Sequence, residues 1–268
     1  MIYVISDIHG CFDELNDLLY KAGFDREKDE LIIAGDIVDR GKDTLKMLRL
    51  LENPPKNFVF LMGNHDYDFL SYCETIIRRF DSRLYKNIGF DEFCDEGILT
   101  YIEDYYGTVA DLIINHNVDI EDFRKWQNCF SKLPYFVERE VNGKKYIIVH
   151  AGYIDKSDYQ YFCMRKLGSG GLRSDIKMFY IWAREEGVRF GGKDNTTIVF
   201  GHTPTIIESE MFFTGGKVFK PDRPSRFQKG KNRRFINIDC GCVYRKYYEK
   251  ANMALLRLDD EKVFYLYE

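Results

Sequence analysis

Long apolar runs are missing from this chain of 268 residues. No run approaches the roughly 18 to 20 apolar residues that a membrane-spanning helix needs. The first residues carry neither a basic start nor an apolar core of signal-peptide length. Strong charge of one sign is missing too, because 39 Lys and Arg face 43 Asp and Glu. Nothing in this balance indicates a nucleic-acid or membrane partner. We therefore expect a cytoplasmic protein with no membrane partner and no obligate nucleic-acid partner.

The seven cysteines lack a pattern as well. Their number is odd, they are scattered, and no Cys-x-x-Cys pair occurs, whereas disulfide frameworks use even, clustered cysteines in short secreted chains. We expect free thiols in a reducing compartment. Cys240 and Cys242 are the one close pair, and we interpret them as buried apolar residues, with a metal or redox site as the weaker alternative.

Six short apolar runs each end near a polar residue of a kind used in catalysis. With 45% hydrophobic and 31% charged residues, the composition is globular, and the length fits one domain, residues 1–268, with an inserted region. Runs this short and rich in Val, Ile and Phe predict buried strands. Sites form at the carboxyl ends of strands in open α/β sheets, so the polar residues should meet there. The predicted strands are 2–5, 31–34, 58–62, 146–149, 197–200 and 235–238.

The segments between these strands show helix and hairpin patterns. Apolar residues at helical spacing predict helices over 12–22 and 44–52. Asn142-Gly143 is a hairpin turn signal, so 136–140 and 145–149 should pair.

A different character begins at residue 67 and lasts to about residue 134. This stretch has helical spacing, many aromatic residues and no strand-like run, which predicts a mainly helical insertion between two core strands. Because its ends join segments close to Asn64 and His150, we expect it to form a wall or lid over the site.

Two further segments read as loops. Gly168-Ser169-Gly170-Gly171 predicts a flexible loop, since no strand precedes it and no Lys-Ser or Lys-Thr follows as in a phosphate-binding loop. Residues 217–234 contain eight basic residues and one acid. We interpret them as a solvated loop, with a docking patch for an anionic polymer as the alternative.

Four of the five histidines end strand-like runs beside a second polar or glycine signal. The fifth, His116, is expected to be a surface residue. Carboxylates, imidazoles and an amide oxygen without thiolates suit hard or borderline divalent metals and argue against a closed zinc site. Six such groups exceed what one ion needs, so we expect two metals that share a carboxylate, Mn first, with Fe or Zn as alternatives. The motifs are Asp7-Ile8-His9-Gly10, Gly35-Asp36-Ile37-Val38-Asp39-Arg40-Gly41, Gly63-Asn64-His65-Asp66, His150-Ala151-Gly152 and Gly201-His202-Thr203-Pro204.

In order and spacing, these motifs resemble those of the phosphoprotein phosphatase branch of the calcineurin-like metallophosphoesterases, over roughly residues 1–245. The resemblance implies an α/β fold of the α+β type, a four-layer β-sandwich of two mixed sheets flanked by helices. It implies His65 as the general acid, oriented by Asp39, and phosphate contacts from Arg40 and Asn64. The metal ligands that it implies are Asp7, His9 and a bridging Asp36 for the first metal, and Asn64, His150 and His202 for the second.

Two departures from the family pattern qualify this comparison. The family usually has Glu after the catalytic histidine, where this chain has Asp66, a change expected to affect a supporting hydrogen bond more than the metals. Arg184 falls where prokaryotic members present a second phosphate-binding arginine.

Residues 201–204 and 238–244 resemble bacterial and phage members, including symmetrical dinucleoside tetraphosphatases. Asp239 could support the site from behind the ligands, and Tyr244 is expected in the core or at the rim.

These features predict a phosphatase that uses a metal-activated water on phosphomonoesters. We favour a serine/threonine protein phosphatase, because Asp39 completes the motif form that protein phosphatases carry. The alternative is a symmetrical dinucleoside tetraphosphatase or another nucleotide or RNA-end pyrophosphohydrolase, with aromatic residues of the insertion and the basic segment as contacts. A metal-stabilised binding module without activity is disfavoured, since no ligand is missing. The sequence does not indicate an oligomeric state.

Overall fold

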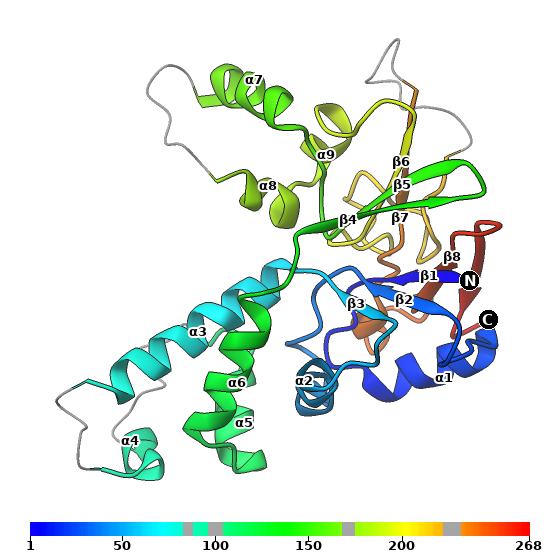
Figure 1. Cartoon of the computed structure of the whole chain (residues 1–268). Helices are drawn as coiled ribbons and strands as arrows, with labels where there is room; N and C mark the ends of the chain where they lie inside the picture. Colours follow the sequence, from blue (N-terminus) through cyan, green and yellow to red (C-terminus); the bar gives the residue numbers. More distant parts are fainter. Residues whose placement is uncertain (83–87, 96–103, 168–174, 222–231) are drawn as a thin grey trace.

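Two mixed sheets pack face to face and helices cover their outer faces, which makes four layers (Figure 1). The computed structural model describes residues 1–82, 88–95, 104–167, 175–221 and 232–268. The expected fold class is therefore confirmed.

The first sheet has five strands in the order β3-β2-β1-β8-β9. Its parallel half pairs β1 with β2 and β2 with β3, while β8 and β9 add to β1 in antiparallel fashion. These strands are β1 (Ile2–Ile5), β2 (Glu30–Ile33), β3 (Phe58–Phe60), β8 (Ala254–Arg257) and β9 (Lys262–Tyr265).

The second sheet has four strands in the order β4-β5-β6-β7. A hairpin joins β4 and β5, whose turn residues Asn142 and Gly143 have φ of 51° and 74°, as the Asn-Gly signal predicts. Parallel pairs β5-β6 and β6-β7 follow. The strands are β4 (Phe136–Val141), β5 (Lys144–Val149), β6 (Thr196–Phe200) and β7 (Arg233–Asn237).

An apolar core fills the space between the sheets. Val4, Ile32 and Leu256 of the first sheet meet Ile148 and Ile236 of the second, all fully buried. Each such side chain contributes about 1.5 to 3 kcal/mol by leaving water. The core thereby holds the carboxyl ends of β1, β2, β5 and β6 in one fixed arrangement.

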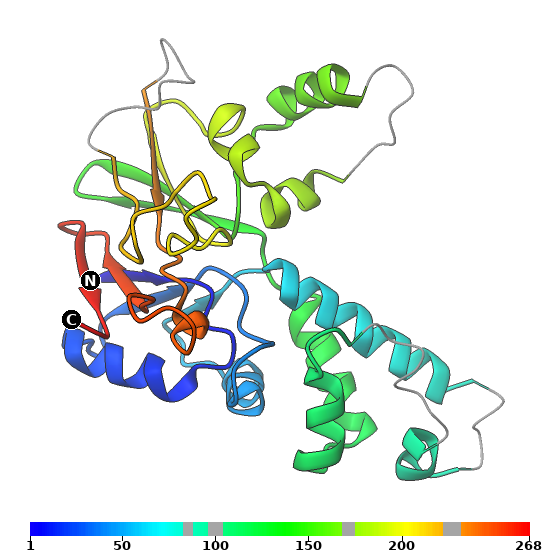
Figure 2. The same cartoon turned by 180° about the vertical axis from the view of Figure 1, so that it is seen from behind.

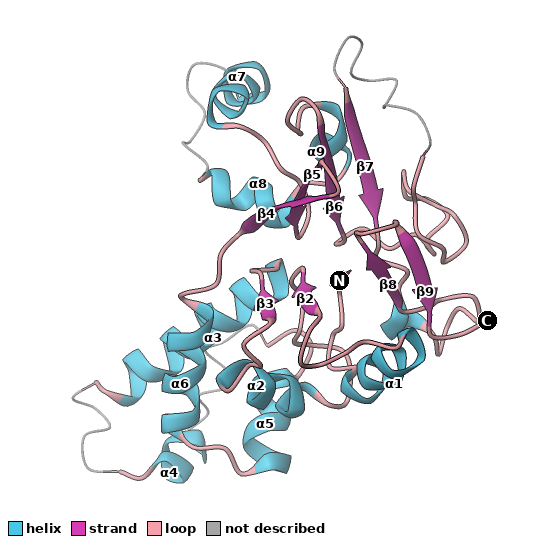
Figure 3. Ribbon diagram, turned by 45° about the vertical axis from the view of Figure 1, so that its right-hand side comes forward, coloured by secondary structure: helices cyan, strands magenta, loops and turns pink. Residues whose placement is uncertain are grey.

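Helices cover both outer faces (Figures 2 and 3). On the first sheet, Leu15 and Leu18 of α1 pack with Tyr3, Ile5 and β2 residues in one cluster. On the second, Val188 of α9 packs with residues of β5, β6 and β7. The helices are α1 (Phe12–Ala22), α2 (Thr44–Glu52), α7 (Lys156–Leu167), α8 (Ile176–Trp182) and α9 (Glu185–Arg189), with a 3-10 turn, η4, at Cys242–Tyr244.

Four more helices lie between β3 and β4, where the helical insertion is predicted. They are α3 (Asn64–Phe80), α4 (Phe90–Asp95), α5 (Thr108–His116) and α6 (Ile120–Phe130). Helical structure begins at Asn64 rather than at residue 67, because the strand end passes directly into α3. The helices extend to one side of the sandwich (Figures 1 and 2), and Asp68 and Tyr106 of the insertion line the cavity over the site, as expected of a wall.

Several remaining predictions can be compared with the structure. The pair β8 and β9 was not predicted, and its Glu261 adopts a left-handed φ of 54° without glycine in the turn. All seven cysteines lie among the described residues and none forms a disulfide, and Cys240 and Cys242 are buried as expected. Residues 168–171 lie outside the described residues. So does most of the basic segment, although Arg234 belongs to β7 and pairs with Glu261.

Among the described residues, no helix combines the length and apolarity needed to cross a bilayer.

Candidate metal centre

The predicted ligands meet where the strands of both sheets end. Asp7 and Asp36 follow β1 and β2, and Asn64 opens α3 after β3. His150 and His202 follow β5 and β6 of the other sheet. All five are buried, so the centre lies in the seam between the two sheets.

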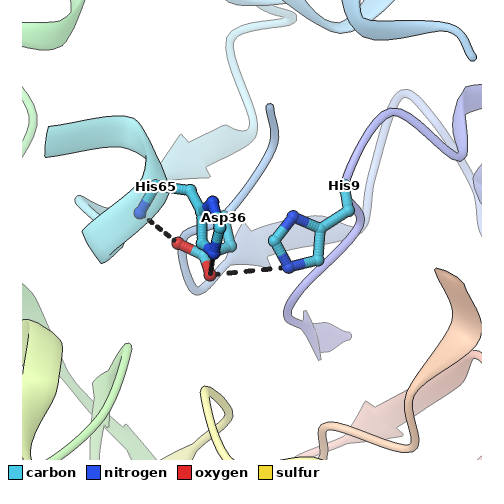
Figure 4. Close-up of side chains that lie close together, drawn as sticks. All are labelled: His9, Asp36 and His65. Carbon is cyan, nitrogen blue, oxygen red and sulfur yellow. Dashed lines mark hydrogen bonds and ion pairs between the residues drawn. The ribbon is translucent and has the colours of Figure 1, made fainter. Parts of the chain in front are cut away.

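Asp36 occupies the middle of this group. Its Oδ2 lies 3.6 Å from Nε2 of His9 and 4.0 Å from Nε2 of His65, as Figure 4 shows. Its Oδ1 lies 3.5 Å from Nε2 of His150 and accepts the backbone N–H of His65 at 3.0 Å. Two sets of buried side chains are each close enough to share an ion, and Asp36 belongs to both: His9, Asp36, His65 and Asp36, His150, His202. One carboxylate thus faces both halves of the centre, as a bridging ligand would.

Asn64 completes the second half. Its Oδ1 lies 3.0 Å from Nε2 of His150 and 2.9 Å from Nδ1 of His202. The outer nitrogen of His202, Nε2, is buried and has no hydrogen-bond partner among the described residues. An amide oxygen and two imidazoles therefore converge on one point.

The hydrogen bonds made by Nδ1 of His9 and His150 indicate whether the opposite ring nitrogens can bind cations. Nδ1 of His9 faces the carbonyl of Val38 at 2.8 Å, and Nδ1 of His150 faces the carbonyl of Ala34 at 2.8 Å. A carbonyl only accepts, so each Nδ1 carries the proton and each Nε2 presents a lone pair. The lone pair of His150 faces oxygens of Asp36 and Asn64, which are acceptors too, while that of His9 accepts from Arg40. Acceptors that converge without a proton between them need a cation, and at His9 the guanidinium takes that place, so the residues fit divalent metals.

Burial and neighbouring charges agree with this interpretation. Burial, followed by the carboxylates of Asp7 and Asp66, raises the pKa of Asp36 well above its usual range. Burial, followed by Arg40, lowers the pKa of His9 well below its usual range, and burial also lowers the pKa of His150. Histidine binds a metal as the neutral imidazole, and a bound cation would relieve the repulsion between the crowded carboxylates that helps to raise the pKa of Asp36.

Asp7 lies beside this group, where its carboxylate helps to raise the pKa of Asp36. Neither ion-sized set of described residues includes it. Both of its carboxylate oxygens instead accept the backbone N–H of His202, at 3.2 and 3.0 Å. His65 takes the third place beside His9 and Asp36, so its role as proton donor or ligand needs a direct test.

The backbone is strained at the predicted site. Of ten non-glycine residues with positive φ among the described residues, six are predicted site residues. Such conformations cost about 1 to 3 kcal/mol each and persist where the surrounding structure holds them. The six are Asp7, His9, Asp36, Asp39, Arg40 and His202.

Two motif glycines allow the close approach of these loops. A Cβ at Gly63 would lie 2.2 Å from Oδ1 of Asp36, and one at Gly201 would lie 2.0 Å from Oδ2 of Asp7. Any side chain at either position would displace a carboxylate of the centre.

His65 and Arg40 stand side by side. Nδ1 of His65 lies 2.6 Å from Oδ2 of Asp39, and both residues are buried. The guanidinium of Arg40 donates to Nε2 of His9 at 2.8 Å and to Nε2 of His65 at 2.9 Å. Since guanidinium only donates, His65 carries its proton on Nδ1, toward Asp39, in this state.

Asp66 links the loop that carries Asp36 to the start of α3 through hydrogen bonds. It accepts the backbone N–H groups of Asp36, Ile37 and Gly63 at 2.8, 3.0 and 3.0 Å. Burial raises its pKa to about 6 even though these three donors oppose the change. The shortening from Glu to Asp was expected to affect a supporting hydrogen bond, and the structure shows that Asp66 accepts three.

A small cavity of about 210 Å³ opens over the centre. Arg184 lies at its edge and donates to Glu210 at 3.2 Å. Tyr244 lies at the rim, with Arg40 5.6 Å above its ring. Asp239 lies behind the ligands, where burial, followed by Asp7, raises its pKa well above its usual range. The cavity is lined by Asp36, Arg40, Asn64, His65, Asp68, Tyr106, Trp182, Arg184, His202, Pro204 and Tyr244.

Two cavity features were not predicted from the sequence. Tyr106, from the insertion, packs 4.9 Å from the His65 ring and accepts from Arg40 at 3.3 Å. Trp182 packs edge-on to His202 at 5.8 Å. Neither lies in a motif, and the only sequence signal near the second is the predicted phosphate-binding Arg184, two positions along the chain. His116 is exposed and pairs with Asp111, as expected of a surface residue.

Comparison with known proteins agrees with this geometry. The calcineurin-like phosphoesterase family model matches residues 1–236. Serine/threonine-protein phosphatase 2 of Salmonella typhimurium is 31% identical over 207 residues, which cover 75% of this chain and 78% of that protein. The symmetrical bis(5'-nucleosyl)-tetraphosphatase of Buchnera aphidicola subsp. Schizaphis graminum is 49% identical over 157 residues, 59% of this chain but only 46% of that enzyme.

A solved structure shares the fold. The crystal structure of a putative diadenosine tetraphosphatase superposes with a TM-score of 0.51 at 18% identity, covering 98% of this chain and 91% of that one. At this identity the likeness concerns the fold alone. Together with the family match and the converging ligands, it leads to one conclusion: the chain belongs to the calcineurin-like phosphoesterases and is a metal-dependent phosphatase.

Proposed function

We propose that this phosphatase hydrolyses phosphomonoesters, with phosphoserine and phosphothreonine side chains of proteins as its favoured substrates. One observation carries the proposal, the 2.6 Å contact between Nδ1 of His65 and Oδ2 of Asp39. A carboxylate behind an imidazole fixes the orientation of the ring, with Nε2 toward the leaving group.

The leaving group explains why this contact favours a phosphoserine substrate. A serine alkoxide is a very strong base, so its departure from phosphorus requires a proton. A nucleoside diphosphate is a far weaker base and departs more easily without one. An oriented proton donor therefore contributes most to hydrolysis of alkyl phosphomonoesters.

The residues of the site would have different roles in the reaction. Arg40 and Arg184 would each present a planar fork of donors to the phosphoryl oxygens. For this, Arg40 has to leave the two imidazoles that it now contacts. That movement frees Nε2 of His65 to carry the proton to the leaving oxygen, while Asn64 faces the phosphoryl group from the other side.

The proposed ligands are Asp7, His9 and Asp36 on one side and Asn64, His150 and His202 on the other, with Asp36 shared. Two divalent cations, when bound, would lower the pKa of a water molecule and neutralise charge on the phosphoryl oxygens. We propose manganese, because carboxylate, amide and imidazole donors without thiolate suit it. Iron and zinc are the alternatives for the same donors.

The cavity size also supports a protein substrate. At about 210 Å³ it is smaller than the roughly 300 to 1,000 Å³ that enclose whole small ligands. A phosphorylated side chain can enter such a cavity while its peptide stays outside.

A symmetrical dinucleoside tetraphosphatase is the second candidate. Three aromatic residues, Tyr106, Trp182 and Tyr244, line the cavity and could stack on a base. The tetraphosphatase named above shares 49% identity over the matched residues.

The experiment is a direct competition of substrates. Purified protein is supplied with Mn²⁺ and assayed on a phosphoserine and phosphothreonine peptide panel and on diadenosine tetraphosphate. We expect higher kcat/KM on the phosphopeptides. Turnover of the dinucleotide that is faster by orders of magnitude would overturn the protein-phosphatase proposal and leave the metal chemistry intact.

A further inference from the structure

The helical insertion reaches the cavity through Asp68 of α3 and through one short stretch, residues 106–108. Tyr106 lines the cavity, Gly107 makes a left-handed turn at φ 71°, and Thr108 begins α5. Much of the described insertion extends to one side of the sandwich (Figures 1 and 2). Residues 106–108 are therefore a place where the insertion can affect chemistry.

Thr108 holds the far side of the Asp39 carboxylate. Its hydroxyl donates to Oδ1 of Asp39 at 2.5 Å, while Oδ2 of the same carboxylate faces Nδ1 of His65 at 2.6 Å. Exposed fractions are only 6% for Thr108, 3% for Asp39 and 5% for His65. In a site this dry, a carboxylate oxygen without a donor costs more than a hydrogen bond usually contributes.

The hydroxyl is not needed by its own helix. The N-cap of α5 is Gly107, and no side-chain capping hydrogen bond is made by it. Asp104 serves the first turn instead, accepting the N–H of Ala110 at 2.9 Å. The Thr108 hydroxyl is thus directed at Asp39 and not at the helix backbone.

Tyr106 confines the same imidazole from another direction. Its ring lies 4.9 Å from the His65 ring, and its hydroxyl accepts from Arg40 at 3.3 Å. His65 is therefore held through Asp39 by one residue of the stretch and packed against by another.

We propose that Thr108 is a positioning residue for the proton donor, acting through Asp39 to hold the His65 imidazole in line with the leaving oxygen. The carboxylate turns about its Cβ–Cγ bond unless both oxygens are engaged, and Thr108 engages the second one. The proposal rests on the proposed function only in that His65 supplies the proton. Under this proposal, efficient proton transfer by His65 requires a residue of the insertion.

The test uses leaving groups of different basicity on the full-length protein with Mn²⁺. Thr108→Val and Thr108→Ala remove the hydroxyl with and without the branched side chain, and Thr108→Ser retains it. Asn115→Ala, on the exposed face of α5, is the matched control. Substrates are a phosphoserine peptide, phenyl phosphate and p-nitrophenyl phosphate.

We expect both hydroxyl-deleting variants to lose roughly tenfold in kcat on phenyl phosphate and on the peptide, with little change in KM. The loss on p-nitrophenyl phosphate should be about twofold or less, because that phenolate departs unprotonated. Thr108→Ser should recover most of the rate. In an Asp39→Asn background, Thr108→Val should add nothing, since it acts through the residue already altered.

A second measurement needs neither metal nor turnover. Nitrogen-15 NMR of the metal-free protein should show the His65 ring as one tautomer with its proton on Nδ1. Thr108→Val should give a mixture of tautomers, and Thr108→Ser should restore the single one.

Equal slowing of all substrates, additivity with Asp39→Asn, or an unchanged His65 spectrum would each overturn the proposal and leave Thr108 with a purely structural role. The proposed substrate class fails separately: if the wild type ignores phosphopeptides yet hydrolyses phenyl phosphate, the aryl substrates still decide the role of Thr108.

Discussion

His65 and the proposed metal-binding histidines are held by different kinds of contact. At His65, side chains contact both ring nitrogens, Asp39 at Nδ1 and Arg40 at Nε2. At His9 and His150, a backbone carbonyl faces Nδ1 and orients the ring.

This difference reflects the role expected of each histidine. A ligand that only binds a cation needs a fixed tautomer, which a backbone carbonyl provides. A proton donor must also change its charge state, and charged side chains such as Asp39 and Arg40 can respond to that change. The four predictions below test this division, beginning with the residue shared by the two sides of the metal centre, the first with His9 and the second with His150.

Asp36→Asn should abolish the distinction by damaging both sides at once. An amide offers one neutral oxygen where the carboxylate offers two charged ones, so both cations lose a ligand. We expect activity to fall by several orders of magnitude and metal content, measured by elemental analysis, to drop below two ions per chain. Asp17→Asn, on the exposed side of α1, is the control. Near-normal kcat with two bound metals would remove Asp36 from the bridging position.

His65→Gln should affect proton transfer on the first side alone. We expect a loss of roughly 10² to 10⁴ on phosphoserine, the usual scale for general acid catalysis, and a clearly smaller loss on p-nitrophenyl phosphate. Metal content should stay unchanged. His116→Gln is a matched control on an exposed histidine. Loss of a metal would instead make His65 the third ligand beside His9 and Asp36.

Asp66→Ala should loosen the loops that carry the first side. Three buried backbone N–H groups lose their acceptor, and we expect the free energy of unfolding to fall by about 3 kcal/mol or more. Urea denaturation of the metal-free protein measures this. Glu74→Ala, on the exposed face of the same helix, should change it by less than about 0.5 kcal/mol. Similar values for the two variants would mean that the loops are held by other contacts.

Arg184→Ala should have the smallest effect, on substrate binding at the rim. Its side chain is 46% exposed and donates to Glu210, so only part of its charge is directed at the cavity. We expect KM to rise roughly tenfold, with a smaller change in kcat. Arg189→Ala, at the end of the short helix α9 that follows Arg184 and paired with Glu185, is the control. An unchanged KM would remove Arg184 from the phosphate site.

Strands and hairpin could be predicted because their patterns are local. Residues 2–5 and the Asn142-Gly143 turn appear where the apolar run and the turn signal indicate. The pair β8 and β9 was missed, because their turn carries no glycine signal and uses Glu261 at positive φ. Only pairing of β8 with β1 makes such short strands stable.

The direction of the insertion could not be predicted either. Its helical spacing is visible in the sequence, but the way it leans depends on α3 and α6 packing together through Phe69, Trp126 and Phe130. These contacts join residues that are far apart in the sequence: Phe69 and Trp126 are 57 positions apart (126 − 69).

By itself, the sequence determined which residues are available to the chemistry, because each motif places a polar group directly after a strand or beside a glycine. It also determined the family, since five motifs in order are specific where one is not. Tertiary structure alone decided that Asp7 turns to the backbone of His202, that Asp66 gathers three N–H groups, and that Thr108 reaches Asp39 across 69 residues. Such contacts depend on how distant loops meet at the seam between two sheets, and no local pattern encodes that distance.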